Sequence, residues 1–215
     1  MSTEDAALPA APHIDGPPPH LLILRAPYYR SVVDGLTEAA VRLLRETGAT
    51  FDVIDVAGAY ELPQALRLAL RGEHVYDGFI VLGCVVRGET DHYEYICGNA
   101  MSGFMTVSLQ FGIALGTGLL TCDTLAQAEA RSGGDGRHNK GAEAAAAALQ
   151  QINIARRLGA VCDGAAPASP AAPHRLPPRG GAGPVPKRAE CGQRGDGDRP
   201  VRPPPPWVAD RVGRV

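Results

Sequence analysis

Four short apolar segments, each followed by a helical pattern, constrain the fold of this chain more than any other feature. The apolar segments span residues 21–24, 51–56, 79–86 and 113–120. Short continuous apolar runs are typical of strands buried on both faces, and their regular alternation with helices is typical of a parallel sheet. We therefore predict an α/β fold: a three-layer sandwich with a four-stranded parallel sheet.

Apolar residues at helical spacing mark the segments between and after these strands. We expect helices from about Ser31 to a stop at Gly48, over 61–71, from the turn at 87–92 to Phe111, over 124–131 and from about 139 to 158. In an open parallel sheet, binding groups gather in the loops after the carboxyl ends of the strands, where the strand order reverses. The polar turns at 25–30, 57–61, 87–92 and 131–140 have that position.

The prolines mark the limits of this domain. Five of the nineteen lie in the first 20 residues and twelve lie after residue 158, whereas only Pro27 and Pro63 lie between. Because regular elements tolerate few internal prolines, we expect a flexible Pro-rich leader at 1–20, a folded domain at 21–158 and a disordered Pro/Gly/Arg-rich tail at 159–215. The composition of the tail is also what an out-of-frame reading of a GC-rich gene would give, so we expect either a frameshift artefact or a genuine disordered tail.

Charge and composition exclude several classes of protein. The chain has a net charge of −2, with a net charge of −6 before residue 159 and +4 after it, so the expected domain has no basic stripe for nucleic acid. No apolar run is long enough to span a membrane, and the acidic N-terminus does not resemble a secretory signal. Five cysteines without a close pair or zinc spacing indicate reduced thiols in the cytoplasm.

The turn after the third strand carries the most informative residues. Residues 88–92 open a helix, whose first turn offers unpaired N–H groups and a positive dipole end to a phosphate. Thr90 adds a hydroxyl, and His92 is suited to proton transfer near neutral pH. The alternative is a simple helix cap at Thr90 or Asp91 beside a solvent-exposed histidine.

The other turns are also open to two interpretations. Arg131 and Lys140 flank a glycine-rich loop and either bind one anion or are surface charges. Glu61 either complements a helix dipole or accepts hydrogen bonds from the hydroxyls of a sugar-like chain. Tyr28 and Tyr29 either cover the core or stack on a planar ring.

Taken together, these turns resemble the lumazine synthase family in residue type, order and spacing. The resemblance rests on Gly58–Pro63, Leu82–Tyr95, Gly118–Thr121 and Asn139–Ala145, and it covers about residues 21–158 but neither flank. It implies a flavodoxin-like sandwich and a transferase of riboflavin biosynthesis. That transferase condenses 5-amino-6-(D-ribitylamino)uracil with 3,4-dihydroxy-2-butanone 4-phosphate to 6,7-dimethyl-8-ribityllumazine, phosphate and water, without a metal or an organic cofactor.

The resemblance assigns one group of residues to the ring and the ribityl chain. Tyr28 would stack on the pyrimidine, Glu61 would accept hydrogen bonds from ribityl hydroxyls, and Lys140 would contact a pyrimidine oxygen. The backbone of Ala59 and Tyr60 would also hold the ligand, and the side chains of Val85 and Val86 would line the pyrimidine pocket.

A second group is assigned to the phosphate and to proton transfer. Glu89, through its backbone, and Thr90 would bind phosphate, with Arg131 as the counter-charge. His92 would be the general acid and base, a role worth about 10²–10⁴-fold in rate. Arg131 and Lys140 would reach these groups from a neighbouring subunit, because the sites of this family lie between subunits of a pentamer.

Three positions depart from the pattern of the family. Pro27-Tyr28-Tyr29 stands where Arg-Phe-Asn is common, which keeps the ring at Tyr28 but alters the path of the loop. Thr117 stands where an aromatic residue of the adjacent subunit often closes the pocket. The loop 132–138 is about one residue longer than usual, which affects the placement of Arg131 relative to Lys140.

The flanks and the departures shape the remaining expectations. In large icosahedral members the N-terminal segment adds a strand to a neighbour's sheet, but prolines cannot donate ladder hydrogen bonds, so we expect a homopentamer or a decamer. The alternatives in activity are a riboflavin synthase of the same fold and a lumazine- or flavin-binding assembly protein with weak catalysis.

Overall fold

The strands form a single parallel sheet in the order β2-β1-β3-β4 in the computed structural model, which describes residues 11–133 and 138–160. The four strands are β1 (His20–Ala26), β2 (Thr50–Asp55), β3 (Gly78–Val86) and β4 (Leu115–Cys122). The predicted tail falls almost entirely outside the described residues, as do residues 1–10 of the predicted leader.

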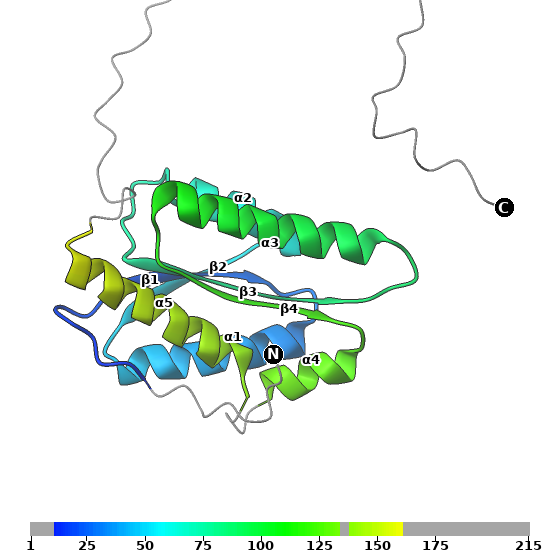
Figure 1. Ribbon diagram of the computed structural model, residues 1–215. Helices are drawn as coiled ribbons and strands as arrows, with labels where there is room; N and C mark the ends of the chain where they lie inside the picture. Colours follow the sequence, from blue (N-terminus) through cyan, green and yellow to red (C-terminus); the bar gives the residue numbers. More distant parts are fainter. Residues whose placement is uncertain (1–10, 134–137, 161–215) are drawn as a thin grey trace, which may run out of the picture. The chain divides into compact units, whose positions relative to one another are not determined.

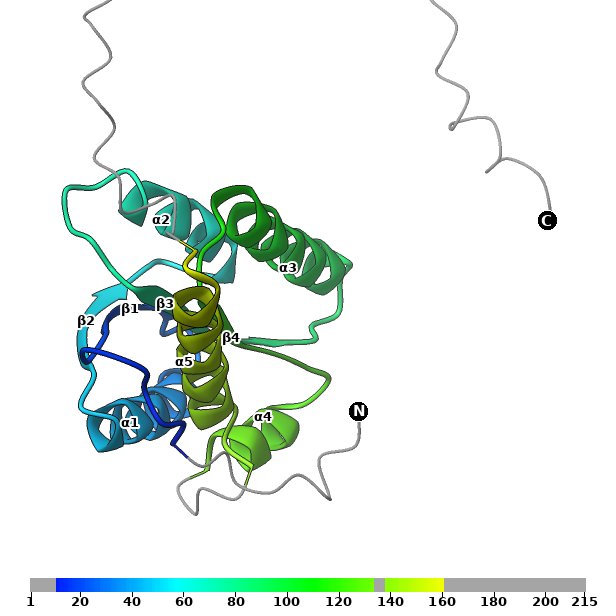
Figure 2. The ribbon, with the colours of Figure 1, turned by 60° about the vertical axis from the view of Figure 1, so that its left-hand side comes forward.

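Helices cover both faces of this sheet (Figure 1; a second view is given in Figure 2). The helices are α1 (Arg30–Glu46), α2 (Leu62–Ala69), α3 (His92–Phe111), α4 (Leu125–Ser132) and α5 (Lys140–Leu158), with one 3₁₀ turn, η1 (Ala59–Glu61). Helices α2 and α3 lie on one face, and α1, α4 and α5 lie on the other. The predicted three-layer α/β sandwich with four parallel strands is therefore confirmed.

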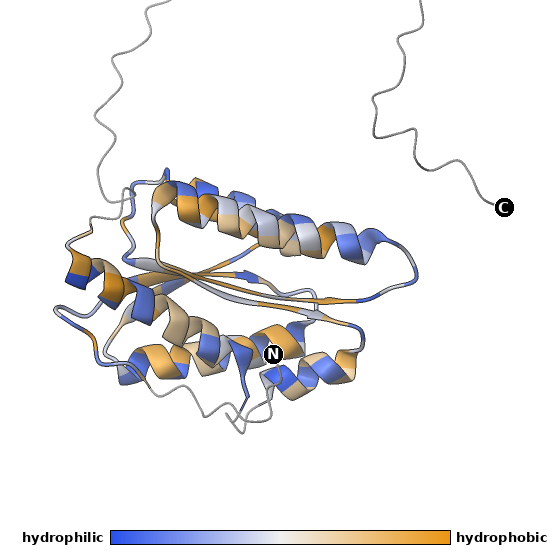
Figure 3. Ribbon diagram, in the orientation of Figure 1, coloured by the Kyte–Doolittle hydropathy of each residue, from blue (hydrophilic) through white to orange (hydrophobic). Residues whose placement is uncertain are grey.

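The central strands are buried on both sides, which explains their continuous apolar sequence. In β1, Leu21 and Ile23 pack into the core under α1 and α5, while Leu22 and Leu24 pack into the core under α2 and α3. All four side chains are at most 1% exposed. Helix α1 turns its apolar side toward the sheet and its polar side outward, whereas α3 also carries apolar residues on its outer side (Figure 3).

The ends of the elements lie within two residues of the sequence prediction. Helix α2 follows a separate 3₁₀ turn and ends at Ala69, two residues before the predicted end. The predicted strand at 113–120 begins two residues later, because Gly112 ends α3 in the left-handed conformation and Ile113 N–H still donates to Ser108 O. Thr124 caps α4, and its hydroxyl accepts a hydrogen bond from Gln127 N–H. These caps set where each loop leaves the sheet.

Residues 11–19 form no helix or strand but are tied to α5. The amide of Asn153, which is only 7% exposed, donates to His13 O at 2.6 Å and accepts from Asp15 N at 3.0 Å. Arg156 donates to Asp15 O at 2.7 Å, and Arg157 pairs with the Asp15 carboxylate at 2.7 Å. Within the predicted leader, the described residues are thus irregular in backbone conformation and hydrogen-bonded to α5.

Within the described residues, no helix combines the length and apolar character needed to cross a membrane.

A glycine in β4 lets α5 approach the sheet closely. A Cβ atom added to Gly116 would overlap the backbone carbonyl of Ala144 in α5, which cannot rotate away. We expect Gly116→Ala to lower the free energy of unfolding by about 1–3 kcal/mol, the range of overpacked cores, as measured by urea denaturation at fixed protein concentration. Gly133→Ala is the matched control: its Cβ would meet only Glu129 O at 3.5 Å, and its φ of −63° suits alanine. Equal stability of the two variants would contradict this account.

Candidate functional site

A cavity of about 860 Å³ opens at the carboxyl ends of β1, β2 and β3. This is the edge of the sheet where the strand order reverses, between β1 and β3, and it is where binding sites of open parallel sheets occur. The lining residues are Tyr28, Tyr29, Ala57, Gly58, Ala59, Tyr60, Glu61, Cys84, Val85, Val86, Gly88, Thr90, His92, Tyr93, Tyr95, Ile96 and Asn99.

The loops after β1 and β2 form what we call the first wall, residues 28–29 and 57–61. The Tyr28 ring is 77% exposed and meets the Tyr29 ring edge-on, with centroids 5.3 Å apart. An exposed aromatic ring at a cavity mouth is free to stack on a planar ligand. Glu61 closes the 3₁₀ turn η1, and its carboxylate lies beside Gly58, where an added Cβ would stand 3.1 Å from Oε2.

The end of β3 and the start of α3 form the second wall, residues 84–99. Thr90 Oγ1 accepts a hydrogen bond from His92 N–H at 3.4 Å, so the hydroxyl lies over the first turn of α3. The first turn of a helix has N–H groups without helical partners and a partial positive charge. The exposed side chain of His92 also lines the cavity. This wall therefore combines an anion seat with a group able to transfer protons.

Eight of the twelve predicted site residues line this cavity. They are Tyr28, Ala59, Tyr60, Glu61, Val85, Val86, Thr90 and His92. Four come from two loops of the first wall and four from the second wall, so the fold brings together residues that are up to 64 positions apart in the sequence.

The other four predicted residues do not line the cavity. The side chain of Glu89 is exposed, and only its backbone was predicted to bind. Thr117 is exposed on the edge strand β4. Arg131 donates to Gln127 O at 2.8 Å within α4, and Lys140 Nζ lies 2.6 Å from the Glu143 carboxylate within α5.

The junction between α4 and α5 is rigidly held by Asn139, which is 2% exposed. Its amide donates to Ser132 O at 2.9 Å and to Gly35 O at 3.1 Å, and its oxygen accepts from Gly141 N at 2.8 Å. One side chain thus joins the end of α4, the start of α5 and α1. Arg131 and Lys140 therefore have fixed positions relative to each other, although both lie outside the cavity of their own chain.

The sequence analysis missed several lining residues of α3. Tyr95, Ile96 and Asn99 lie one and two turns after His92 on the same side of the helix, and Asn99 Nδ2 donates to Tyr95 O at 2.8 Å. Residues 92, 95, 96 and 99 recur at helical spacing, so the sequence alone indicates that they share one face of the helix with His92. Apolar residues at this spacing also pack into the core, and the sequence alone does not separate those that face the cavity.

Three thiols lie in and beside the second wall, and all three are free. Burial, followed by the neighbouring Cys122 and Cys97, raises the pKa of Cys84 to about 12. Burial also raises the pKa of Cys97 and of Cys122. These thiols are protonated at neutral pH, which is the opposite of what a nucleophilic cysteine needs.

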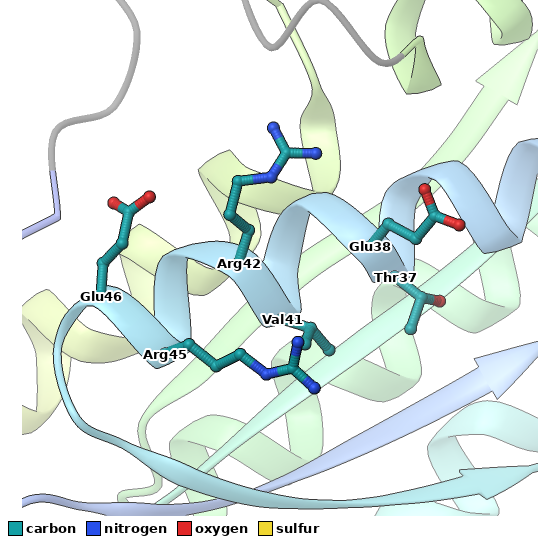
Figure 4. A pocket seen from close by; sticks show the side chains of 6 residues that line it. All are labelled: Thr37, Glu38, Val41, Arg42, Arg45 and Glu46. Atoms are coloured by element: carbon teal, nitrogen blue, oxygen red, sulfur yellow. The ribbon is translucent and has the colours of Figure 1, made fainter.

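A second hollow of about 680 Å³ lies on the outer side of α1 (Figure 4). Its six lining residues all come from this one helix, and their side chains fan outward in different directions: Thr37, Glu38, Val41, Arg42, Arg45 and Glu46. Because no polar groups from separate elements converge there, it has none of the features of the first cavity. Among residues 11–133 and 138–160, no group of three or more His, Cys, Asp or Glu side chains could hold a metal ion.

Comparison with known proteins gives one consistent result. Residues 18–156 match the family model described as 6,7-dimethyl-8-ribityllumazine synthase. A protein of that name from Bartonella bacilliformis is 42% identical over 142 residues, which are 66% of this chain and 93% of the relative. The synthase of Nitrobacter winogradskyi is 44% identical over 143 residues (64% and 86%), and that of Agrobacterium fabrum is 41% identical over 145 residues (66% and 97%).

The raised pKa of Cys84 predicts a slow reaction with alkylating agents. At pH 8 we expect iodoacetamide to modify Cys84 on the order of 10³-fold more slowly in the folded protein than in denaturant, because the fraction of thiolate falls as the pKa rises from about 8.5 to about 12. Peptide mass spectrometry over time measures the rate at this residue. Equal rates in the folded and unfolded chain would identify Cys84 as an activated thiol and overturn this interpretation.

Proposed function

This chain belongs to the 6,7-dimethyl-8-ribityllumazine synthase family, and we propose that its strand-end cavity performs the condensation of that family. It is a transferase of riboflavin biosynthesis. The observation that carries the proposal is the convergence of Tyr28, Glu61, Thr90 and His92 on one cavity from three separate loops. The reaction requires a platform for a flat ring, partners for a polyhydroxyl chain, a seat for phosphate and a proton shuttle.

The first wall would hold 5-amino-6-(D-ribitylamino)uracil. The exposed ring of Tyr28 would stack on the pyrimidine, and the Glu61 carboxylate would accept hydrogen bonds from the ribityl hydroxyls. The backbone of Ala59 and Tyr60 would hold the same ligand. Across the cavity, Val85 and Val86 supply the apolar lining for the ring.

The second wall would hold 3,4-dihydroxy-2-butanone 4-phosphate. Thr90 and the backbone at Glu89 would bind the phosphate at the start of α3, where the helix dipole favours an anion. His92 would move protons as the amine and the ketone form an imine with loss of water, phosphate is eliminated, and ring closure on the second carbonyl releases a second water. None of these steps needs a metal or an organic cofactor.

The remaining predicted contacts would come from a neighbouring copy of the chain in a homopentamer or a decamer. Arg131 and Lys140 carry charges that the cavity lacks, yet both lie outside the cavity of their own chain. Thr117 on the edge strand β4 would lie at the same boundary. An exposed apolar stripe along α3 supports such an assembly, because large apolar side chains left open on one helix face are typical of interfaces. This stripe consists of Tyr95, Met101, Met105 and Leu109.

Domain limits and compartment complete the proposal. We propose that residues 21–158 are the catalytic unit, which is supported by a family match over residues 18–156. We place the enzyme in the cytoplasm, which is supported by the free thiols of the three cysteines in the described residues.

The activity assay tests both the reaction and the role of His92. Mixing the two substrates with the full chain should produce 6,7-dimethyl-8-ribityllumazine, followed by its absorbance. We expect His92→Ala to lower kcat by about 10²–10⁴-fold, the usual contribution of a general acid or base, while product binding measured by fluorescence is kept. His74→Ala is the matched control, because His74 lies against Tyr76 in the loop before β3, outside the cavity.

Two results would contradict this assignment. Absence of product together with tight binding of the lumazine would identify a binding protein instead of a synthase. Dismutation of added lumazine to riboflavin would identify the riboflavin synthase activity of the same fold.

Sedimentation velocity tests the assembly. We expect a particle of five or ten chains of 22.5 kDa each, because the prolines at positions 9, 12 and 17–19 cannot donate the hydrogen bonds of an added strand. A sixty-subunit particle, with a mass on the megadalton scale, would refute this expectation. A monomer that is fully active would refute the shared site.

A further inference from the structure

Two arginines occupy equivalent places at the carboxyl ends of β1 and β3, the two central strands of the sheet. Arg25 is the last but one residue of β1, and Arg87 directly follows β3. Each donates to an aspartate at the end of the neighbouring strand and to an acidic residue in the helix that follows its own strand. Neither residue lines the cavity. We call these groups the β1 clamp (Arg25, Asp34, Asp55) and the β3 clamp (Arg87, Glu94, Asp123).

The β1 clamp fixes the strand ends behind the first wall. Arg25 Nε and one terminal nitrogen donate to the two carboxylate oxygens of Asp55 at 2.7 and 2.9 Å, and the other terminal nitrogen lies 3.3 Å from Asp34 in α1. The backbone at Arg25 also accepts from Val56 N at 2.7 Å. A two-point contact of this kind fixes orientation as well as distance. The Arg25 side chain is only 18% exposed, whereas the Asp55 carboxylate is 44% exposed, so the guanidinium is the more confined member of the pair.

The β3 clamp fixes the strand end behind the second wall. Arg87 Nε donates to Asp123 at 2.8 Å, and a terminal nitrogen donates to Glu94 at 2.6 Å in the first turn of α3. The guanidinium lies 4.2 Å from the centre of the Tyr93 ring, and the backbone N–H of Arg87 donates to Cys122 O at 2.9 Å. The start of α3, which carries His92, is thus tied to the end of β4.

The two clamps lie on opposite faces of the sheet and share no residue. Arg25 reaches toward α1, and Arg87 reaches toward α3, which cover opposite faces (Figure 1). The segment between Arg25 and Asp34 contains Tyr28, and the segment after Asp55 leads to Glu61. The segment between Arg87 and Glu94 contains Thr90 and His92. Each clamp therefore encloses the loops of one wall only.

We propose that Arg25 and Arg87 are positioning residues that set the two substrate subsites independently, the β1 clamp for the ribitylaminouracil and the β3 clamp for the butanone phosphate. This inference rests on the proposed function for the identity of the two substrates. The chemistry of the clamps supports it: hydrogen bonds to Asp55 and to Asp123 raise the pKa of Arg25 and of Arg87 respectively, so both guanidiniums keep their charge at any working pH.

Steady-state kinetics with each substrate varied in turn test the proposal. Arg25→Met is expected to raise KM for the ribitylaminouracil by about tenfold or more, since a displaced contact of about 1 Å is enough for losses of that size, and to leave KM for the butanone phosphate within about twofold. Arg87→Met is expected to do the reverse. Arg25→Lys and Arg87→Lys keep the positive charge but cannot make the two-point guanidinium contact. Each should raise the KM for the same substrate as the methionine variant, but by a smaller factor.

Each variant has a matched control on the same side of the sheet. Arg45→Met removes an exposed charge of α1 beside Phe51, and Arg67→Met removes the arginine that stacks on Phe111 at the far end of α3. Neither control should change either KM by more than about twofold, because both arginines lie outside the cavity and outside the two clamps. Should a methionine variant not fold, Asp55→Asn and Asp123→Asn remove the acceptor charge at nearly constant size and should give the same split.

Hydrogen exchange separates this proposal from the proposed function. In Arg25→Met, amide exchange should become faster at residues 26–30 and 56–58 and stay unchanged at 87–92, and Arg87→Met should show the opposite pattern. If the wild-type chain makes no product, the proposed function fails, while the exchange pattern still decides whether the clamps act on separate walls. Equal changes in both KM values, or faster exchange in both segments with either variant, would overturn the proposal.

Discussion

The burial of β1 and β3 on both faces is the constraint on which the rest of this structure depends. Leu21–Leu24 and Ile80–Leu82 are at most 1% exposed, and such strands need helices above and below them. Parallel strands also require each connection to cross back over the sheet, so every strand points its carboxyl end to the same edge. The cavity forms there because β1 and β3, adjacent in space, send their connections to opposite faces, which leaves a crevice between the loops.

This arrangement gives one chain both walls of the cavity, whereas Arg131 and Lys140 lie outside its lining. The loops after β1, β2 and β3 converge on the cavity, whereas the connection after β4 leads away into α4. Asn139 then fixes the end of α4 to the start of α5, which keeps Arg131 and Lys140 in place without any substrate. In the proposed assembly, these two cations would reach the cavity of a neighbouring chain with the α4–α5 junction already formed, and such preorganisation lowers the cost of binding an anion.

The sequence predicted well those features that depend on a few neighbouring residues, and poorly those that depend on contacts between distant parts of the chain. Continuous apolar runs located β1 and β3, because burial on both faces leaves few polar positions in them. The edge strand β2 is mostly exposed and carries two aspartates, so it was located by its place in the strand–helix alternation. The start of β4 was misplaced by two residues, since the left-handed cap Gly112 keeps Ile113 N–H bonded to Ser108 O of α3, and pattern alone does not show the φ of Gly112. In the site, His92 and Thr90 were found through the turn they occupy, but Tyr95 and Asn99 were missed because cavity and core share one helix. The arginine clamps were invisible, since Arg25 and Asp55 are 30 residues apart and become partners only through the strand register.

The contacts of residues 11–19 with α5 oppose the addition of this segment to a neighbour's sheet, as the prolines within it also do. A segment that adds a strand to a neighbour must present its own backbone groups, yet here the backbone at His13, Asp15 and Pro17 is already bonded to Asn153 and Arg156 of the same chain. The partner amide is nearly buried, and leaving it unpaired would cost about 1–3 kcal/mol. Exchange to a neighbour would therefore have to break these contacts and form a ladder in which the prolines cannot donate. Both effects oppose the exchange of this N-terminal segment with a neighbouring chain.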